Sequence, residues 1–277
     1  MRVAVAQIDP KLAEKDRNLD VCLQRLEEAV AAGARLLVLP ECAIPGYMFE
    51  SAEEALPYAE EIPGPSTDAL AEACRESGAH VVCGLIERDG DRLHNAAVLV
   101  GPDGLVGSYR KTHLPFLGVD RFVTPGDELP VWETPLGRIG VEICYDLRFP
   151  EVTRTLALRG ADLICHPTNF PMAARVQTEL ITVARAAENR VFLLTANRCG
   201  QERWAEFCGR SQIVDPYGTR LAETDVAGEE LLVADLEVEK ARDKDYVIPG
   251  EYELYLFGHR RPELYGALVE ETQSVTT

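Results

Sequence analysis

Three reactive side chains of this 277-residue chain each come just after a predicted strand: Glu41, Lys111 and Cys144. The strand-like runs before them cover residues 36–39, 105–110 and 139–143. Because sites in α/β sheets form outside the carboxyl ends of strands, we expect the three side chains to meet in one cavity. There the carboxylate can take the thiol proton, while the ammonium favours the thiolate and stabilises an oxyanion. This combination predicts nucleophilic catalysis by a thiol.

Each of these side chains also has an ordinary structural explanation. Glu41 could be a loop carboxylate, Lys111 a solvated neighbour of Arg110, and Cys144 one more buried thiol, the usual role of a cysteine. The catalytic interpretation is favoured because all three occupy the same kind of position. Burial of Glu41 would raise its pKa and suit it to act as a base. A histidine-based mechanism is less attractive because no histidine has a distinctive partner motif, although His113 is a candidate for lining the site.

Predicted strands and helices alternate along the chain, with hairpins at the turn sequences 89–90 and 102–104. Apolar spacing predicts a helix that starts at an Asn18 cap and ends at Gly33, and a long helix over 175–189. Further strands are predicted at 2–8, 80–86, 138–144, 162–165, 191–196 and 211–214, with the last strand at 230–236. This alternation predicts a layered α/β architecture of mixed sheets flanked by helices.

The net charge, the hydropathy pattern and the cysteine spacing narrow the class of protein. A formal charge of −18 argues against a nucleic-acid partner, because phosphate binding needs clustered Lys and Arg. The chain has no long apolar run and no signal-peptide pattern, so we expect a cytoplasmic protein that does not contact membranes. The eight cysteines have irregular spacings and no CxxC, which argues against a zinc or redox motif. No linker divides the chain, so we expect one domain over residues 1–277, with 256–277 as a C-terminal tail.

Three segments around the reactive residues resemble the nitrilase superfamily of carbon–nitrogen hydrolases. LPECAIPGY is similar to the family's glutamate motif, YRKTHLP to its lysine motif and GVEICYDLRFPE to its cysteine motif. Downstream, VARAAENRVFLLTANRCG, GRSQIVDPYG and RRPELY resemble segments of the amidase and ω-amidase branch. The resemblance covers almost the whole chain, with the three motifs in the family's order.

The resemblance implies a fold and a set of roles. It implies a four-layer αββα sandwich of two mixed β-sheets flanked by helices. It makes Glu41 the general base, Lys111 the oxyanion stabiliser and Cys144 the nucleophile, with no metal and no organic cofactor. It also implies a homodimer or higher homo-oligomer, often with the C-terminal tail crossing between subunits.

One departure from the family pattern concerns a second acid. Many members carry another glutamate after the lysine motif, where this chain reads LPFLGVDRFVTPGDE. We expect Asp120 to take that place, with Glu128 as the alternative and loop capping as its structural role. Glu142 falls on the same side of the predicted strand as Cys144, and we expect a structural role for it rather than a substrate contact.

The expected reaction is hydrolysis of a small linear amide or carbamoyl compound through a Cys144 thioester, with release of ammonia. The backbone N–H of Tyr145 is expected to join Lys111 in holding the oxyanion. The expected substrate pocket includes Tyr47, Thr168, Asn169 and Phe170, each of which could equally serve in turns or core packing. Arg148 and Arg175 could bind a substrate carboxylate, but pairing with acidic groups is the favoured expectation.

Two other functions are kept open. The first is hydrolysis of a nitrile to the acid and ammonia, which the same residues could perform through a thioimidate. The second is a weakly active scaffold or binding protein, against which the intact Glu41, Lys111 and Cys144 speak. Nucleotide binding has little support, because neither GxGxxG nor GxxxxGK[ST] occurs.

Overall fold

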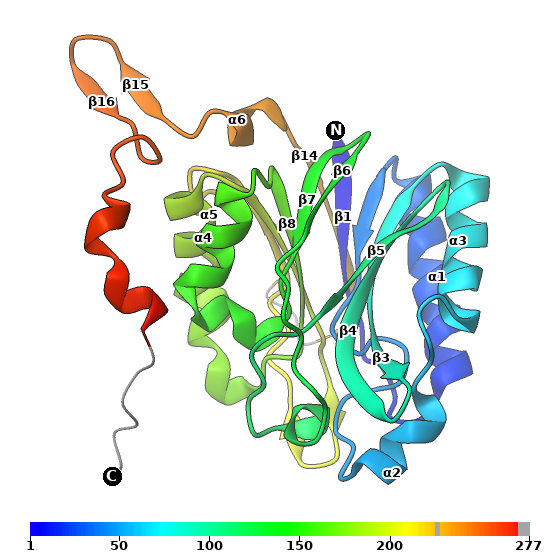
Figure 1. The fold of residues 1–277 in the computed structure, drawn as a ribbon. Coiled ribbons are helices and arrows are strands. Elements are labelled where there is room, and N and C mark those ends of the chain that lie inside the picture. The colour runs from blue at the N-terminus through cyan, green and yellow to red at the C-terminus, as the bar shows by residue number, and fades with distance from the viewer. Residues whose placement is uncertain (225–227, 271–277) are drawn as a thin grey trace. The chain divides into compact units, whose positions relative to one another are not determined.

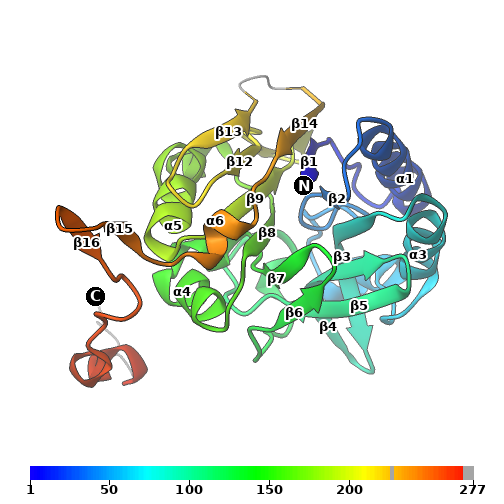
Figure 2. The same cartoon turned by 90° about the horizontal axis from the view of Figure 1, so that it is seen from above.

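The computed structural model describes residues 1–224 and 228–270, and the chain divides into two compact units, Met1–Arg242 and Asp243–Thr277. In the larger unit, two six-stranded sheets pack face to face, and helices cover the outer side of each sheet (Figure 1). The view from above shows the same layers end-on (Figure 2). The expected four-layer αββα sandwich is therefore confirmed.

The first sheet has the strand order β14-β1-β2-β3-β4-β5. Its strands are β1 (Arg2–Gln7), β2 (Leu36–Val38), β3 (His80–Asp89), β4 (Arg92–Gly101), β5 (Gly104–Arg110) and β14 (Glu230–Asp235). β1, β2 and β3 are parallel, while β4 and β5 form the predicted antiparallel hairpin pairing. Two successive antiparallel pairings make β5 run in the direction of β2 and β3, so the carboxyl ends of β2 and β5 lie at the same end of the sheet.

The second sheet has the strand order β13-β12-β9-β8-β7-β6. Its strands are β6 (Val131–Thr134), β7 (Gly137–Val141), β8 (Leu163–Thr168), β9 (Phe192–Asn197), β12 (Gln212–Val214) and β13 (Arg220–Glu223). β7, β8 and β9 are parallel, and the other three strands are antiparallel to their neighbours. β8 and β9 are buried along their whole length, which explains their nearly continuous apolar sequences.

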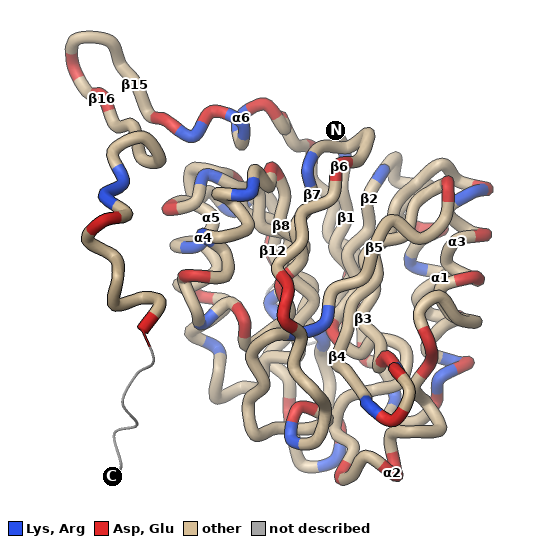
Figure 3. Tube along the Cα trace, in the orientation of Figure 1, with Lys and Arg blue, Asp and Glu red and all other residues tan. Residues whose placement is uncertain are grey.

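Helices α1 (Lys15–Ala31) and α3 (Pro65–Ser77) cover the first sheet, and α4 (Pro150–Leu158) and α5 (Thr182–Asn189) cover the second (Figure 1). Each turns a stripe of apolar residues to its sheet, such as Cys22, Leu26 and Ala29 of α1. The charged residues gather on the helices and loops, and the central strands carry few of them (Figure 3). Among the described helices, none has the length and hydropathy that crossing a bilayer requires.

Short elements complete the two units. They are α2 (Ala52–Ala55), α6 (Glu239–Arg242), the strand pairs β10 (Gln201–Glu202) with β11 (Ala205–Glu206) and β15 (Tyr246–Ile248) with β16 (Tyr252–Leu254), the 3₁₀ helices Leu56–Tyr58, Gly118–Arg121, Cys144–Arg148, Met172–Ala174, Pro262–Leu264 and Gly266–Val269, and the π-helical turn Gln177–Ile181. The pair β15–β16 shows that the strand expected at 230–236 is not the last one.

One of the two helix expectations was wrong. Asn18 is not the cap of the first helix, which begins three residues earlier at Lys15. Its buried side chain instead bonds the backbone of Lys11 and donates to the carbonyl of Ile44 at 2.8 Å, so it ties the helix to the loop after β2. The helix expected over 175–189 is confirmed over residues 176–189, where the π-helical turn Gln177–Ile181 leads directly into α5.

Candidate active site

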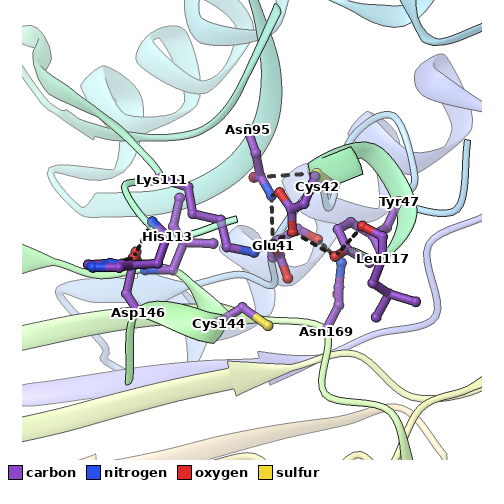
Figure 4. Close-up of polar contacts among 12 residues, drawn as sticks. Glu41, Cys42, Tyr47, Asn95, Lys111, His113, Leu117, Cys144, Asp146 and Asn169 are labelled. Atoms are coloured by element: carbon purple, nitrogen blue, oxygen red, sulfur yellow. Dashed lines mark hydrogen bonds and ion pairs between the residues drawn. The ribbon is translucent and has the colours of Figure 1, made fainter. Parts of the chain in front are cut away.

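The three reactive side chains come together, as expected from their strand ends, and Asp120 joins them (Figure 4). The ammonium of Lys111 lies 2.7 Å from Glu41 Oε1 and 2.6 Å from Asp120 Oδ2. The amide of Asn95 donates to the same two carboxylates, at 2.7 Å to Glu41 and 2.8 Å to Asp120. None of the Lys111, Glu41 and Asp120 side chains is exposed to solvent. One cation and two carboxylates therefore share a desolvated cluster.

Glu41 is held by a tight turn after β2. Gly84 of β3 packs against this turn so closely that a Cβ there would lie 2.5 Å from Pro40 O and 2.7 Å from Glu41 Cα. The following residue, Cys42, has a φ of +46°, a conformation that is costly for any residue with a Cβ. Burial raises the pKa of Glu41 above its ordinary value, and Asp120 adds to the rise against the opposing effect of Lys111. A raised pKa brings this carboxylate closer to the range of a general base.

Lys111 follows β5 directly, and its backbone N–H donates to the carbonyl of Asn95 at 2.8 Å. Although burial alone would lower it, the Asp120 and Glu41 carboxylates raise the pKa of Lys111 well above its usual value. The two carboxylates therefore favour the charged form of this side chain. Two of its three N–H groups point to carboxylates, so one is left to stabilise a developing negative charge.

Cys144 is the first residue of the 3₁₀ helix Cys144–Arg148, in the turn that follows β7. Its φ is +48°, a left-handed value that is costly for a residue with a Cβ, and its sulfur lies beside Glu41 and Asn169 (Figure 4). Burial, followed by the Glu41 carboxylate, raises the pKa of the Cys144 thiol far above its usual range, while Lys111 and the Thr168 hydroxyl oppose the rise. The resting thiol is therefore protonated and needs a base when it attacks.

Asp146 connects the cysteine turn to the lysine segment. Its Oδ2 accepts the backbone N–H of Ile143 at 2.9 Å and the hydroxyl of Tyr109 at 2.7 Å. Its Oδ1 accepts from the Thr112 hydroxyl at 2.9 Å and from the His113 backbone N–H at 3.0 Å. Although burial alone would raise it, these bonds, led by the His113 side chain, hold the pKa of Asp146 below its ordinary value. One carboxylate thus fixes the segments that carry Cys144 and Lys111.

Two histidines lie near the cysteine turn, and each is hydrogen-bonded to another group. His113 bonds Asp146 at 2.8 Å and stacks on Phe149, on the side of the turn away from Glu41 (Figure 4). His166 lies 3.3 Å from the backbone carbonyl of Cys144, and burial lowers the pKa of His166 to about 4. A carbonyl only accepts hydrogen bonds, so the neutral ring of His166 carries its proton on Nε2. This geometry is in keeping with a mechanism that does not use histidine.

The residues expected to bind substrate lie around the cluster, several of them already engaged. Tyr47 is buried and donates its hydroxyl to Asp120 at 2.7 Å. Asn169 donates to the backbone carbonyl of Glu41 at 2.9 Å, and Thr168 is buried beside the thiol. Phe170 is buried, and its backbone N–H donates to an asparagine of β9. The ring of Tyr145 meets Phe149 edge-on, while the oxyanion role of its backbone N–H stays a prediction.

The three acids whose roles the sequence left open lie in different places. Asp120 lies in the cluster, whereas Glu128 lines a separate cavity of about 310 Å³ together with Ser108 and Arg110. Glu142 is wholly buried and accepts the hydroxyl of Thr153 on α4 at 2.8 Å. It therefore points to the helical layer, as does Gly140 two residues earlier, whose Cβ would lie 3.3 Å from Leu156 of α4. The alternation of β7 thus continues through Glu142, and the left-handed turn at Cys144 breaks it.

The two arginines considered for a substrate carboxylate already have protein partners. Arg175 bonds Glu179 at 2.6 Å. Arg148 faces the side-chain oxygen of the buried Gln177, at 2.8 Å from Nη2, when that amide is oriented to accept.

Four residues of the site were not identified as functional candidates from the sequence, namely Asn95, Asp146, His166 and Glu202. Asn95 interrupts an apolar strand, and Asp146 lies inside the cysteine motif, so both gave a weak signal. A cavity of about 410 Å³ was also not foreseen. Leu117 connects this cavity to the cluster. It lines the cavity, and its carbonyl accepts the hydroxyl of Tyr47, which also bonds Asp120, at 3.0 Å. Its lining residues are Met48, Glu50, Phe116, Leu117, Gly118, Arg121, Arg203 and Trp204.

Comparison with protein families and curated proteins gives consistent matches. A family described as carbon-nitrogen hydrolase matches residues 2–246. A nitrilase of Pyrococcus abyssi is 41% identical over 246 residues, which cover 88% of this chain and 92% of that protein. An ω-amidase of Xenopus tropicalis is 34% identical over 272 residues, which cover 94% of each chain.

Solved structures show the same architecture. A cysteine-to-alanine variant of an amidase from Nesterenkonia matches with a TM-score of 0.79 and 28% identity, over 97% of both chains. A glutamate-to-glutamine variant of that amidase, with a TM-score of 0.76 and 29% identity over 88% of this chain and 96% of that one, shows the Michael addition of acrylamide at its active-site cysteine. In another structure of a glutamate-to-glutamine variant, the acetamide moiety of fluoroacetamide is bound covalently to that cysteine.

Proposed function

The chain belongs to the carbon–nitrogen hydrolase family of the nitrilase superfamily, and from that premise we propose that it hydrolyses small linear amides or carbamoyl compounds through a Cys144 thioester. The observation that carries the proposal is the Lys111 ammonium held 2.7 Å from Glu41, with the Cys144 sulfur beside the same residue. The amidase with active-site adducts of acrylamide and fluoroacetamide supports small amides as the substrate class.

In the first half of the reaction, Glu41 takes the proton of the Cys144 thiol as the sulfur attacks the amide carbon. The negative charge that develops on the amide oxygen is held by the third N–H of Lys111 and the backbone N–H of Tyr145. Glu41 then passes the proton to the leaving nitrogen, the C–N bond breaks and ammonia departs. The acyl group stays on Cys144 as a thioester.

In the second half, Glu41 takes a proton from water, and the oxygen of that water attacks the thioester. The acid product leaves when the C–S bond breaks and Cys144 regains its proton. Asp120 keeps Lys111 charged and oriented through both halves, helped by Asn95 and Tyr47.

The cavity beside the cluster supplies room for the acyl part of the substrate. Phe116 and Trp204 stand at its rim with 88% and 72% of their surfaces exposed, so an apolar chain placed there would cover them. Arg121 and Arg203 of the lining are engaged by backbone carbonyls and by Glu50, respectively. Glu50 neutralises Arg203, whereas Arg121 keeps its positive charge, so these contacts do not select between a neutral acyl chain and one that ends in a carboxylate.

Nitrile hydrolysis is the second candidate, favoured by the 41% identity to a nitrilase. Attack on a nitrile would give a thioimidate, which water converts to the thioester and ammonia. The homo-oligomer, the role of the C-terminal tail and the cytoplasmic location stay predictions from the sequence.

A screen for ammonia release tests the proposal. Short aliphatic amides, carbamoyl amino acids and nitriles are each incubated with the wild-type chain and with Cys144→Ala. We expect release from amides or carbamoyl compounds that is lost in the variant. Release from nitriles alone would make the second candidate correct, and release that persists in Cys144→Ala would overturn both. Absence of release, together with no selective modification of Cys144, would favour a scaffold.

A further inference from the structure

Glu202 is a buried carboxylate that no step of the proposed reaction uses. It lies in β10, and its side chain is only 3% exposed. Its Oε2 accepts two consecutive backbone N–H groups, from Tyr47 at 2.9 Å and from Met48 at 2.6 Å. These two residues belong to the loop that follows Glu41. A carboxylate from the second half of the chain therefore fixes the backbone of the glutamate loop.

A buried arginine neutralises this carboxylate. Arg198 is wholly buried, and its Nη1 lies 2.8 Å from Glu202 Oε1. The same guanidinium donates to Pro10 O at 2.8 Å and to Asp9 at 3.1 Å, and it stacks on the ring of Phe207. Burying an ion pair costs desolvation that its own attraction barely offsets. The pair is therefore better explained by what it positions than by a gain in stability.

The glutamate loop is shaped to receive Glu202. Gly46 has a φ of +87°, and a Cβ there would lie 2.7 Å from Leu12 Cα and 3.0 Å from Glu202 Oε1. A glycine is needed at this position both for its backbone conformation and for the close approach of the carboxylate. The close approach of Glu202 to the loop therefore depends on the absence of a side chain at position 46.

Tyr47 links this contact to the reacting cluster. Its backbone N–H is bound by Glu202, and its hydroxyl donates to Asp120 at 2.7 Å. Asp120 in turn lies 2.6 Å from the Lys111 ammonium. We propose that Glu202 is a positioning residue: by fixing the Tyr47 backbone, it keeps the Tyr47 hydroxyl on Asp120 and so holds Lys111 in place for the reaction. This inference rests on the proposed function of Lys111.

A double-mutant cycle tests the inference. The rate constant for alkylation of Cys144 by acrylamide is measured by intact-protein mass spectrometry for wild type, Glu202→Gln, Tyr47→Phe and the double variant, and kcat for ammonia release is measured alongside. If Glu202 acts through Tyr47, each single variant loses about tenfold in both rates, and the double variant loses at most about twofold more than the slower single.

Glu60→Gln is the matched control. Glu60 is also buried, accepts the backbone N–H of Ser66 at 2.8 Å and pairs with Lys15 at 2.5 Å, but it precedes α3 and bonds the first turn of that helix. We expect it to lower the melting temperature and to leave both rates per folded molecule within about twofold of wild type. A merely structural role for Glu202 would give the same pattern in Glu202→Gln and would overturn the inference, as would losses that multiply in the double variant.

Glu202→Asp decides the question if Glu202→Gln does not fold. It keeps the charge opposite Arg198 but withdraws the carboxylate from the two N–H groups by one methylene, so the same rate loss is expected and unchanged rates would refute the inference. Failure of the proposed function is separately visible: Cys144→Ala would then be alkylated, or release ammonia, as fast as wild type.

Discussion

The ammonium of Lys111 lies 2.6 Å from Asp120 Oδ2, and both side chains are fully buried. The contact makes Asp120 a direct partner of Lys111, and its replacement of the family's second glutamate stays a prediction. The hydroxyl of Tyr47 and the amide of Asn95 complete its hydrogen bonds. A buried cation between two carboxylates depends on both of them, because removing one partner of a buried pair is strongly destabilising.

Asp120→Asn should therefore impair the reaction. We expect kcat/KM to fall on the order of 100-fold, the effect of losing an oxyanion donor, because Lys111 loses half of its anchoring. The Asp120 carboxylate also raises the pKa of Glu41, so the acid limb of the pH–rate profile should move to lower pH in the variant. Activity is lost as the pH falls through the pKa of Glu41, since a base must be deprotonated.

The control for this prediction is Glu128→Gln, which alters the other acid considered for the role. It should keep the wild-type profile, because Glu128 lines a different cavity. An unchanged rate in Asp120→Asn, or an acid limb that moves upward, would remove Asp120 from the account.

Asp146→Asn should reduce both stability and rate. An amide nitrogen in place of one oxygen would face the donors that now bind that oxygen, which include Tyr109 and Ile143 on one side and Thr112 and His113 on the other. We expect a loss of about 3 kcal/mol in the free energy of unfolding, measured by urea titration, and a lower kcat in the molecules that fold.

Asp162→Asn provides a matched comparison for Asp146. Asp162 is buried too and accepts the backbone N–H of Arg138 at 3.0 Å, but it precedes β8 and so lies at the end of the sheet opposite to Cys144. The Asp162→Asn variant should be less stable than wild type and should keep the wild-type kcat per folded molecule. Equal effects of both variants on the rate would contradict a specific role for Asp146.

Gly84→Ala should displace Glu41 through a clash of backbone atoms. The added Cβ would lie 2.5 Å from both Cys42 N and Pro40 O, which cannot move aside like the end of a side chain. We expect a cost of about 1–3 kcal/mol in the free energy of unfolding and a fall in kcat. Gly228→Ala, with open space around its Cβ, should be close to neutral in both measurements. A Gly84→Ala chain that is fully active would show that the turn tolerates movement.

Glu142 should make the fold less stable as the pH rises. Burial raises the pKa of Glu142 to about 8, so between the usual carboxyl range and that value the folded chain holds a proton that the unfolded chain releases. Stability then falls by about 1.4 kcal/mol per pH unit across that window. Glu142→Gln cannot ionise, so its free energy of unfolding should depend less on pH between 6 and 9 than that of wild type. Parallel pH dependences would refute this prediction.

The strand ends could be predicted from the sequence because apolar runs mark buried strands, and parallel strands align their carboxyl ends. That reasoning brought Glu41, Lys111 and Cys144 to one place without any contact being known. The assignment of their roles, in contrast, came from the resemblance of the surrounding motifs to a family.

The supporting contacts could not be predicted in the same way. Asn95 and Glu202 are polar residues without a periodic pattern, and only the packing of distant segments shows what they bind. The left-handed backbone of Cys144 is imposed by its surroundings rather than by its residue type. Helical spacing alone likewise does not distinguish an α-helix from the π-helical turn before α5.

The most direct test of the central claim is to find which cysteine reacts with a small amide-like electrophile. The chain is incubated with fluoroacetamide, and the adduct is located by intact-mass measurement and peptide mapping. Cys208→Ser serves as a background, because Cys208 is the most exposed of the eight cysteines. We predict one adduct per chain, at Cys144, present in Cys208→Ser and absent in Cys144→Ala. An adduct that persists in Cys144→Ala, or that spreads over several cysteines, would contradict the claim that Glu41 and Lys111 activate Cys144.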